Sequence, residues 1–464
     1  MLSNQPKDVL CIDQPYVEYF NTVLANPPSS FHQQMATAVL SMYQDLAAQV
    51  ASMTYYFDDV EYIRATYPRL FAKVVSRGTP QGEDVIEVQK SDFHFTVYPI
   101  AFSVPAENIQ SQTPPKSKAI CRVIPGHWGT YFRMNEEDLY RAELQQSLFA
   151  YTFKKAGWDC MRHYEILAAG SLPLFLDLSL LPAFKETSMA FPTTLALHPL
   201  SVYSLIVQYP SLAVAITQSG TGWNIDLASF NYPATDFDKQ LYTAITMATL
   251  QYTRNVFSTT SMAQYLLRQV QRSNRERSDR TPSEIQRVLF LSNDCFDWTG
   301  DYIVDTLLHG FKQLLGEASG TVVQLHRRPS VTRTMEHFDQ TAHDQFKSML
   351  YGGGMTFGLK LNSLTMSGDQ HSGNGVDYDV AVIDAMVQAH VFDLVIYASA
   401  HRRGSVNEIT DPQFFTIWQS VCNVYARDEV ALVDGSDEGI KPSELDVLLP
   451  CASHVFTREG IQRT

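Results

Sequence analysis

The stretch LFAYTFKKAGWDCMRHYEILAAGSLPLFLD, residues 148–177, predicts a strand, a helix and a second strand in direct succession. Its first segment, 148–154, is a short apolar run, and the segment 158–170 has the length of a helix that Gly170 ends. The third segment, from Ser171 onward, is again rich in apolar residues. Strands separated by one helix at this spacing are typical of a parallel sheet with crossover connections.

The same alternation continues on both sides of this stretch. Upstream, an apolar run at 119–124 precedes a helical pattern at 135–147 with acidic residues in its first turn, where they complement the helix dipole. Downstream, three further apolar runs are typical of buried parallel strands: 287–292, 392–399 and 429–435. We therefore expect an α/β protein with two Rossmann-like domains and a helical N-terminal region.

Changes in composition along the chain predict where these parts begin and end. The segment 271–283 is polar, charged and nearly free of apolar residues, which is typical of a linker between domains. The expected divisions are a helical region at 1–88, a first Rossmann-like domain with trailing helices at 89–270, the linker at 271–283 and a second Rossmann-like domain at 284–464.

Composition and charge exclude several classes of function. The net charge of −14 over 464 residues argues against a general nucleic-acid or anionic-membrane surface, because phosphate binding needs clustered Lys and Arg. No segment reaches the length of an apolar membrane span, and the first residues lack the pattern of a secretory signal. The six cysteines are far apart and form no Cys-x-x-Cys pair, which favours reduced, buried thiols. We expect a cytoplasmic protein.

Polar residues follow the strand 148–154 and enter the next helix, at the strand end where open α/β sheets bind ligands. Two ammonium groups beside a helix N-terminus are suited to a pyrophosphate. Arg162 and Glu165 share a helix face, so Glu165 can accept hydrogen bonds from a ribose diol while Arg162 holds a phosphate. Gly170 allows a close backbone approach. The expected donor-binding residues are Lys154, Lys155, Trp158, Asp159, Arg162, Glu165, Gly170 and Ser171. The alternative is a surface ion pair between Arg162 and Glu165, with solvated lysines.

The segment GWDCMRHYEILAAGSLPLF resembles the donor-binding segment of exostosin-like glycosyltransferases, which have two Rossmann-like domains in the GT-B architecture. The matching positions are Arg162, Glu165, Gly170 and Pro173. Further segments resemble bacterial and viral glycosyltransferase-like proteins, patchily over about 93–460: AFSVPAENI, LQYTRNVFSTTSMAQYLL, VLFLSNDCFDWTGDYIVDTLLHGFKQLLG and FDLVIYASAHRR. The resemblance implies that Glu165 contacts a sugar nucleotide and that no metal is required. It also implies a permuted domain order, because the VLFLS domain precedes the GWDCMRHYE domain in that family.

Candidates for catalysis and acceptor binding follow the strands of the second domain. His401 lies two residues after the end of the strand 392–399 and is a candidate general base for an acceptor hydroxyl. Asp294, after the strand 287–292, is the alternative candidate. Arg402, Arg403 and Asp434 are candidates for acceptor binding. The pattern Asp-Tyr-Asp at Asp377 and Asp379 matches a metal-binding motif of other glycosyltransferases, but it lies in a polar segment and we expect no metal.

The expected function is transfer of a sugar from a nucleotide-diphosphate donor to a glycan or another hydroxyl acceptor, with no cofactor besides the nucleotide sugar itself. Two alternatives remain open. One is a non-catalytic carbohydrate- or partner-binding protein that has a glycosyltransferase-like fold. The other is a transferase that uses a different nucleotide on the C-terminal domain, for which SNDCFDWTG at 292–300 lacks the glycine-rich turn.

Overall fold

The structure is a computed structural model. The residues that it describes are 73–78, 84–90, 93–125, 128–133, 136–152, 160–175, 216–219, 222–225, 236–277, 284–292, 302–316, 322–324, 332–333, 341, 356, 358, 360–362, 380–398, 412–436 and 450–458. These residues belong to two compact units. Unit 1 holds those between 106 and 257, and unit 2 holds those between 73 and 105 together with those from 258 onward.

This division differs from the expected domain boundaries. The segment 89–270 was expected to form one domain, but its first strand and its last helix belong to unit 2. The chain therefore enters unit 2, leaves it to form unit 1 and then returns. The expected linker at 271–283 also begins inside a helix, α11, which runs from Thr259 to Arg277. Its polar residues are compatible with a helix that has a partly exposed face.

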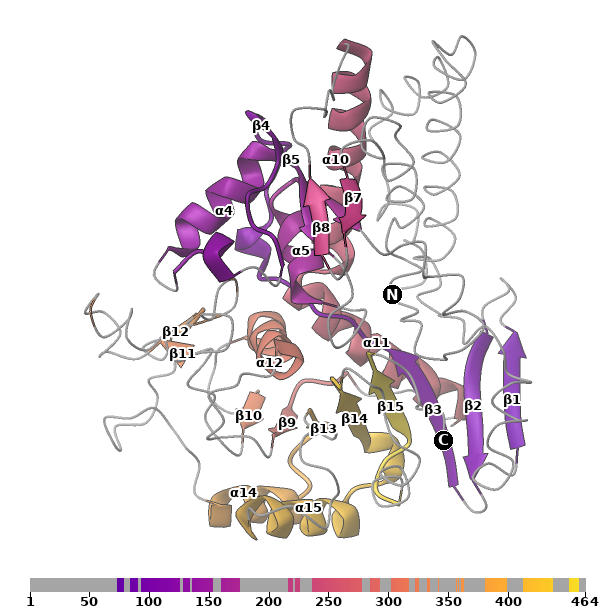
Figure 1. Ribbon diagram of the computed structural model, residues 1–464. Helices are drawn as coiled ribbons and strands as arrows, with labels where there is room; N and C mark the ends of the chain where they lie inside the picture. The colour runs from indigo at the N-terminus through magenta and orange to yellow at the C-terminus, as the bar shows by residue number, and fades with distance from the viewer. Residues whose placement is uncertain are drawn as a thin grey trace. The chain divides into compact units, whose positions relative to one another are not determined.

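Unit 2 contains an eight-stranded sheet in the order β1-β2-β3-β15-β14-β13-β9-β10 (Figure 1). The six neighbours from β3 to β10 are parallel, and β2 and β1 add an antiparallel pair at one side. The strands are β1 Lys73–Gly78, β2 Asp84–Lys90, β3 Phe93–Pro99, β9 Val288–Leu291, β10 Val322–Gln324, β13 Leu394–Tyr397, β14 Val430–Asp434 and β15 His454–Thr457. The two short strands β11 Thr332–Arg333 and β12 Leu361–Asn362 pair separately.

The expectation of a helical region at 1–88 is wrong for its last part. Residues 73–78 and 84–88 lie in β1 and β2, while residues 1–72 lie outside the described residues. The sequences KVVSRG and DVIEVQK carry β-branched residues, which favour a pleated strand. Pairing of β2 with β3 then joins them to the sheet.

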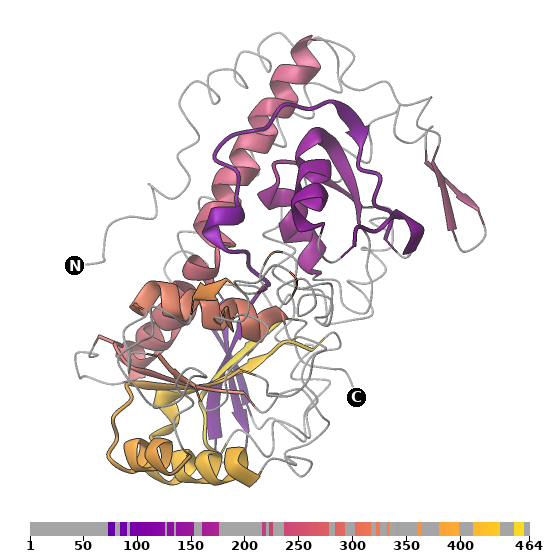
Figure 2. The same ribbon diagram turned by 90° about the vertical axis from the view of Figure 1, so that its left-hand side faces the viewer.

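Helices cover both faces of this sheet, as Figures 1 and 2 show. On one side lie α14 Val380–Gln388 and α15 Pro412–Val424, and on the other lie α11 and α12 Tyr302–Leu315. Alternate strand residues face opposite sides. Leu289 and Leu291 belong to the same hydrophobic cluster as buried residues of α14 and α15. Phe290, between them, contacts Phe311 of α12. Burial on both faces explains why the strands are continuous apolar runs.

The helices α11 and α12 approach each other very closely where α11 begins. A Cβ atom added to Gly310 of α12 would lie 2.0 Å from the carbonyl oxygen of Thr259. The neighbouring His309 places Nδ1 2.9 Å from Thr259 Oγ1, and both residues are buried. Gly310 is therefore required by this contact, because any larger residue would push the helices apart.

Unit 1 contains a parallel sheet of three strands in the order β4-β5-β6, which confirms the predicted strand–helix–strand pattern. The strands are β4 Lys118–Ile120, β5 Ser147–Thr152 and β6 Leu172–Phe175, and the helices are α4 Glu137–Gln146, α5 Met161–Ala168 and α10 Asp236–Val256. The crossover helices are α4 and α5, and α10 packs against α5. A separate hairpin joins β7 Ile216–Ser219 to β8 Gly222–Ile225.

Two cysteines form a disulfide bond, which corrects the expectation of reduced thiols. Cys422 of α15 is bonded to Cys451, which precedes β15, with their Cα atoms 4.8 Å apart. The two cysteines are 29 residues apart in the sequence, so no short cysteine motif indicates that they pair. Cys121 and Cys160 carry thiol groups, and Cys11 and Cys295 lie outside the described residues.

Within the part of the chain that the structure describes, no helix combines the length and the hydropathy that a membrane crossing requires.

Candidate functional site

The candidate site lies where β5 ends and α5 begins, at the carboxyl edge of the sheet of unit 1. Arg162 is in the first turn of α5, and Glu165 follows one turn later. Both side chains are partly exposed, so they are within reach of a ligand. The segment between β5 and α5 holds Lys154, Lys155, Trp158 and Asp159, and these residues lie outside the described residues.

Glu165 is held in place by a tyrosine from the neighbouring helix. The hydroxyl of Tyr140 in α4 donates a hydrogen bond to Glu165 Oε2 over 2.7 Å. Burial raises the pKa of Tyr140, and the charge of Glu165 raises it further, so the phenol remains a donor. Sequence analysis missed Tyr140, because a tyrosine in an amphipathic helix has no distinguishing local signal.

Arg162 has a buried nitrogen without a partner. Its Nη1 atom is inaccessible to solvent and forms no hydrogen bond within the described residues. Leaving a buried polar group without a partner is costly, and a charged group is the most costly of all. A bound anion or a water molecule would satisfy this nitrogen.

A second polar atom without a partner lies at the end of β5. Thr152 is the last residue of that strand, and its hydroxyl is buried with no hydrogen bond to any described residue. The preceding Tyr151 also has a buried hydroxyl of this kind, and burial raises the pKa of Tyr151. The carboxyl end of β5 therefore carries unsatisfied hydrogen-bonding capacity close to the start of α5.

The end of β4 completes this edge with a thiol and an arginine. Burial raises the pKa of Cys121 to about 11, so the thiol stays protonated at neutral pH and is a poor nucleophile. The guanidinium of Arg122 lies 4.0 Å from the centre of the Phe132 ring. The backbone N–H of Arg122 donates to Glu143 over 3.0 Å. Cys121 and Arg122 thus have structural environments that sequence analysis did not predict.

Gly170 and Ser171 have packing roles instead of the expected role in donor binding. Gly170 has φ +67°, and a Cβ added there would lie 2.8 Å from Pro114 Cδ. Its N–H and that of Ser171 bond back to Leu167 and Ile166, which ends α5 in a Schellman motif. Ser171 is fully buried at the amino end of β6, the end of the sheet opposite to Arg162.

Asp434 also differs from its expected role in acceptor binding. It ends β14 and is fully buried. Its carboxylate accepts a hydrogen bond from Thr457 Oγ1 at 3.0 Å, which joins the ends of β14 and β15, and a second from Ser436 Oγ at 3.1 Å. Beside it, the buried Arg458 donates to the carbonyl of Gly435 over 2.9 Å. Sequence analysis placed Asp434 correctly at a strand end but had no information on its burial.

The two candidate general bases follow strands that are neighbours in the sheet of unit 2. In β9 and β13, Leu291 pairs with Tyr397, and the next N–H, of Ala398, donates to Leu291 over 2.9 Å. The strand order reverses direction between β9 and β13, which is where doubly wound sheets bind ligands. Asp294 and His401 lie outside the described residues, as do Arg402 and Arg403.

Comparison of the chain with known protein families, curated proteins and solved structures finds no match. A search for metal ligands in the described ranges finds no group of three or more His, Cys, Asp or Glu side chains. Asp377 and Asp379, the alternative metal ligands, lie outside those ranges.

Proposed function

We propose that the protein is a glycosyltransferase that moves a sugar from a nucleotide-diphosphate donor to a glycan or another hydroxyl acceptor. The observation that carries this proposal is the buried, unpartnered Nη1 of Arg162, one turn from a glutamate that Tyr140 orients. A cation with unsatisfied donors suits a phosphate, and an oriented carboxylate suits a pair of ribose hydroxyls. The resemblance of this segment to exostosin-like glycosyltransferases supports the same assignment.

In this proposal the residues around α5 bind the donor. Arg162 contacts the diphosphate, together with Lys154 and Lys155, and Glu165 accepts hydrogen bonds from the ribose. Positive charge beside the diphosphate stabilises the negative charge that develops as the sugar–phosphate bond breaks, and no metal ion is needed for this. Trp158 and Asp159 contribute further donor contacts from the same segment.

The second Rossmann-like unit supplies the acceptor side in this proposal, giving the GT-B architecture. His401 or Asp294 removes the proton of the acceptor hydroxyl, and Arg402 and Arg403 bind the acceptor. The adjacent ends of β9 and β13 support this assignment, because both candidate bases follow these strands within a few residues. The buried Asp434 has no part in it.

A binding experiment tests the donor site. We would titrate the full chain with UDP, GDP, CDP and ADP, and with their common sugar conjugates, by calorimetry. At least one nucleotide should bind, and Arg162→Gln and Glu165→Gln should each weaken it tenfold or more. Loss of one charge-assisted hydrogen bond costs about 1.5–3 kcal/mol of binding free energy, which corresponds to a tenfold or larger loss of affinity. The matched controls are the exposed Arg133→Gln and Glu107→Gln, which should bind as the original chain does.

A turnover experiment then separates the enzyme from its non-catalytic alternative. Release of the nucleoside diphosphate from the bound donor would be followed with a panel of glycan acceptors, with and without EDTA. We expect release that persists in EDTA. Donor binding without release for any acceptor would favour a carbohydrate-binding protein, and activity that needs added Mn²⁺ or Mg²⁺ would return attention to Asp377 and Asp379.

A further inference from the structure

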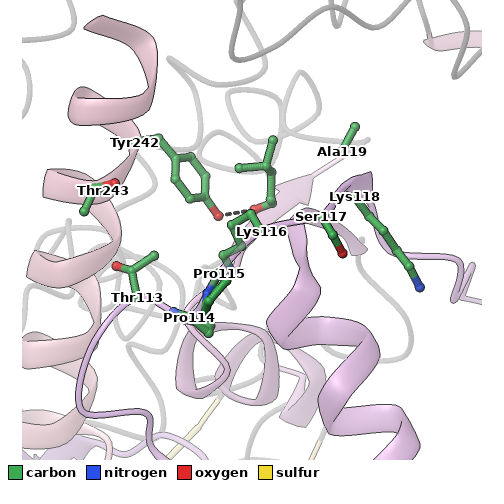
Figure 3. A pocket seen from close by; sticks show the side chains of 10 residues that line it. Thr113, Pro114, Pro115, Lys116, Ser117, Lys118, Ala119, Tyr242 and Thr243 are labelled. Carbon is green, nitrogen blue, oxygen red and sulfur yellow. Dashed lines mark hydrogen bonds between the residues drawn. The ribbon is translucent and has the colours of Figure 1, made fainter. Parts of the chain in front are cut away.

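A cavity lies at the amino edge of the sheet of unit 1, the edge opposite to Arg162. It has a volume of about 520 Å³, which is within the usual range for small-molecule sites. Figure 3 shows it between α10, which carries Tyr242 and Thr243, and the segment that leads into β4. Its lining residues are Thr113, Pro114, Pro115, Lys116, Ser117, Lys118, Ala119, Leu148, Tyr242 and Thr243.

The charge of this lining is positive, in contrast to the acidic balance of the whole chain. Of its ten residues two are lysines and none is acidic, whereas the chain has a net charge of −14. Lys118 is neutralised by an ion pair with Glu143. Hydrogen bonds from Lys118 and from the backbone of Arg122 keep the pKa of Glu143 low although burial opposes this, so Glu143 remains charged. Lys116, the second lysine of the lining, has no carboxylate partner among the described residues.

The hydrogen-bond partners of Lys116 within the described ranges are neutral groups. Its Nζ donates to the carbonyl of Gln145 over 2.8 Å and to Ser171 Oγ over 3.3 Å. No described carboxylate pairs with it, and burial lowers the pKa of Lys116 to about 7. An ammonium group taken out of water without a counter-ion is unfavourable. An anion bound in the cavity would supply the missing charge.

The apolar walls of the cavity are fixed by internal contacts. The hydroxyl of Tyr242 donates to the carbonyl of Leu148 over 2.6 Å, as the dashed line in Figure 3 shows. Pro114 packs against Gly170, and Thr113 is hydrogen-bonded to Thr246 of α10 over 2.6 Å. A ligand would therefore meet proline and tyrosine surfaces that are already in position, which lowers the entropic cost of binding.

We propose that this cavity binds a small organic anion, a carboxylate or a phosphate monoester attached to a ring, with Lys116 pairing with the anionic group. The ring fits the apolar surfaces of Pro114, Leu148 and Tyr242. This site is separate from the proposed donor site, since the two lie at opposite edges of one three-stranded sheet. It therefore does not depend on the proposed function.

Calorimetric titration of the full chain tests the proposal with four probes: benzoate, phenyl phosphate, and the neutral ring compounds benzamide and benzyl alcohol. At least one of the two anions should bind, and neither neutral compound should bind at the same concentration. Preference between benzoate and phenyl phosphate distinguishes a carboxylate site from a phosphate site. Equal binding of the neutral compounds would overturn the proposal, as would binding of none of the four.

Variants assign the binding to Lys116. Lys116→Met keeps the apolar stem and should weaken binding of the anion at least tenfold. The control Arg133→Met removes an exposed positive charge outside the lining and should leave the affinity within twofold. Arg162→Gln, at the proposed donor site, should leave the affinity for the anion unchanged. A wrong donor-site assignment would therefore not affect this test of the cavity. Unchanged affinity in Lys116→Met would overturn the proposal. If that variant does not fold, Thr243→Trp provides the test instead. Thr243 is exposed and lines the cavity, so the larger tryptophan side chain should fill the cavity and abolish binding of the anion.

Discussion

At the scale of single residues, the candidate site depends on side chains that touch across two helices. Arg162 and Glu165 are three positions apart on α5, which is visible in the sequence. Tyr140 belongs to α4 and reaches Glu165 of α5 across a separation of 25 residues in the sequence. The orientation of Glu165 is therefore a property of the fold.

The contact between Tyr140 and Glu165 can be tested by removing one oxygen. Tyr140→Phe should raise the Kd of the bound nucleotide about tenfold, because a lost hydrogen bond to a carboxylate is worth about 1.4 kcal/mol or more. Calorimetry measures this, with the partly exposed Tyr131→Phe as the control. An unchanged Kd would mean that Tyr140 only fills space beside Glu165.

The lowered pKa of Lys116 predicts that the free energy of unfolding depends on pH. Burial lowers the pKa of Lys116 in the folded protein to about 7, from 10.5. Between these values the unfolded chain binds more protons, so the free energy of unfolding should rise as the pH rises above 7. The gain is below about 1.4 kcal/mol per pH unit, because the side chain is only partly buried.

Urea unfolding between pH 7 and 8.5 at constant ionic strength measures this effect. The rise should be present in the original chain and smaller in Lys116→Met. The window stops below pH 9, because the raised pKa of Cys121 acts in the opposite direction above it. Parallel curves for the two proteins would contradict the prediction.

At the scale of secondary-structure elements, close packing between helices depends on small residues at particular positions. Gly310→Ala should lower the free energy of unfolding by about 3 kcal/mol or more, because the new methyl group would overlap the carbonyl of Thr259. The control is Gly129→Ala, where an added Cβ meets nothing within 4 Å and the effect should stay within about 0.5 kcal/mol. Denaturant unfolding measures both, and equal effects would refute the helix contact.

The disulfide bond joins α15 to the segment before β15. Closing a loop of 29 residues stabilises a protein by about 3–4 kcal/mol through the unfolded chain. The double variant Cys422→Ala with Cys451→Ala should lose that amount, and dithiothreitol should destabilise the original chain but not the variant. Titration of thiols in the denatured, unreduced protein provides the check: six reactive thiols would show that the bond is absent.

At the scale of the whole molecule, the sheet of unit 2 is built from two distant parts of the chain. The strand β3, residues 93–99, pairs with β15, residues 454–457, so a segment that precedes unit 1 in the sequence belongs to the same sheet as strands that follow unit 1. Pairing of strands so far apart in the sequence closes a long loop, which has an entropic cost and slows folding.

This arrangement predicts that the second expected domain does not fold alone. A fragment of residues 284–464 lacks β3 and α11, and it exposes the backbone edge of β15 together with the surface under Tyr265. It should aggregate or unfold without cooperativity in circular dichroism, whereas the full chain should unfold cooperatively. A fragment with a sharp unfolding transition would show that β3 is dispensable.

The sequence by itself determined the local features of this protein. The strand–helix–strand pattern at 148–177 and the buried strands near 288, 394 and 430 are visible because apolar periodicity is a property of neighbouring residues. The polar residues at the start of α5 are visible for the same reason. Arg162 and Glu165 thus remain candidates after the structure is known.

Only the tertiary structure decided which distant segments meet. The strands at 73–90, the position of β3 beside β15 and the bond between Cys422 and Cys451 depend on pairing across long sequence separations. Burial of Asp434 and Ser171 depends on the same packing, although each stands beside a strand as ligand-binding residues often do. A polar side chain is available to a ligand only if it is not buried against partners within the protein. Those partners are distant in the sequence, so a local sequence pattern does not reveal them.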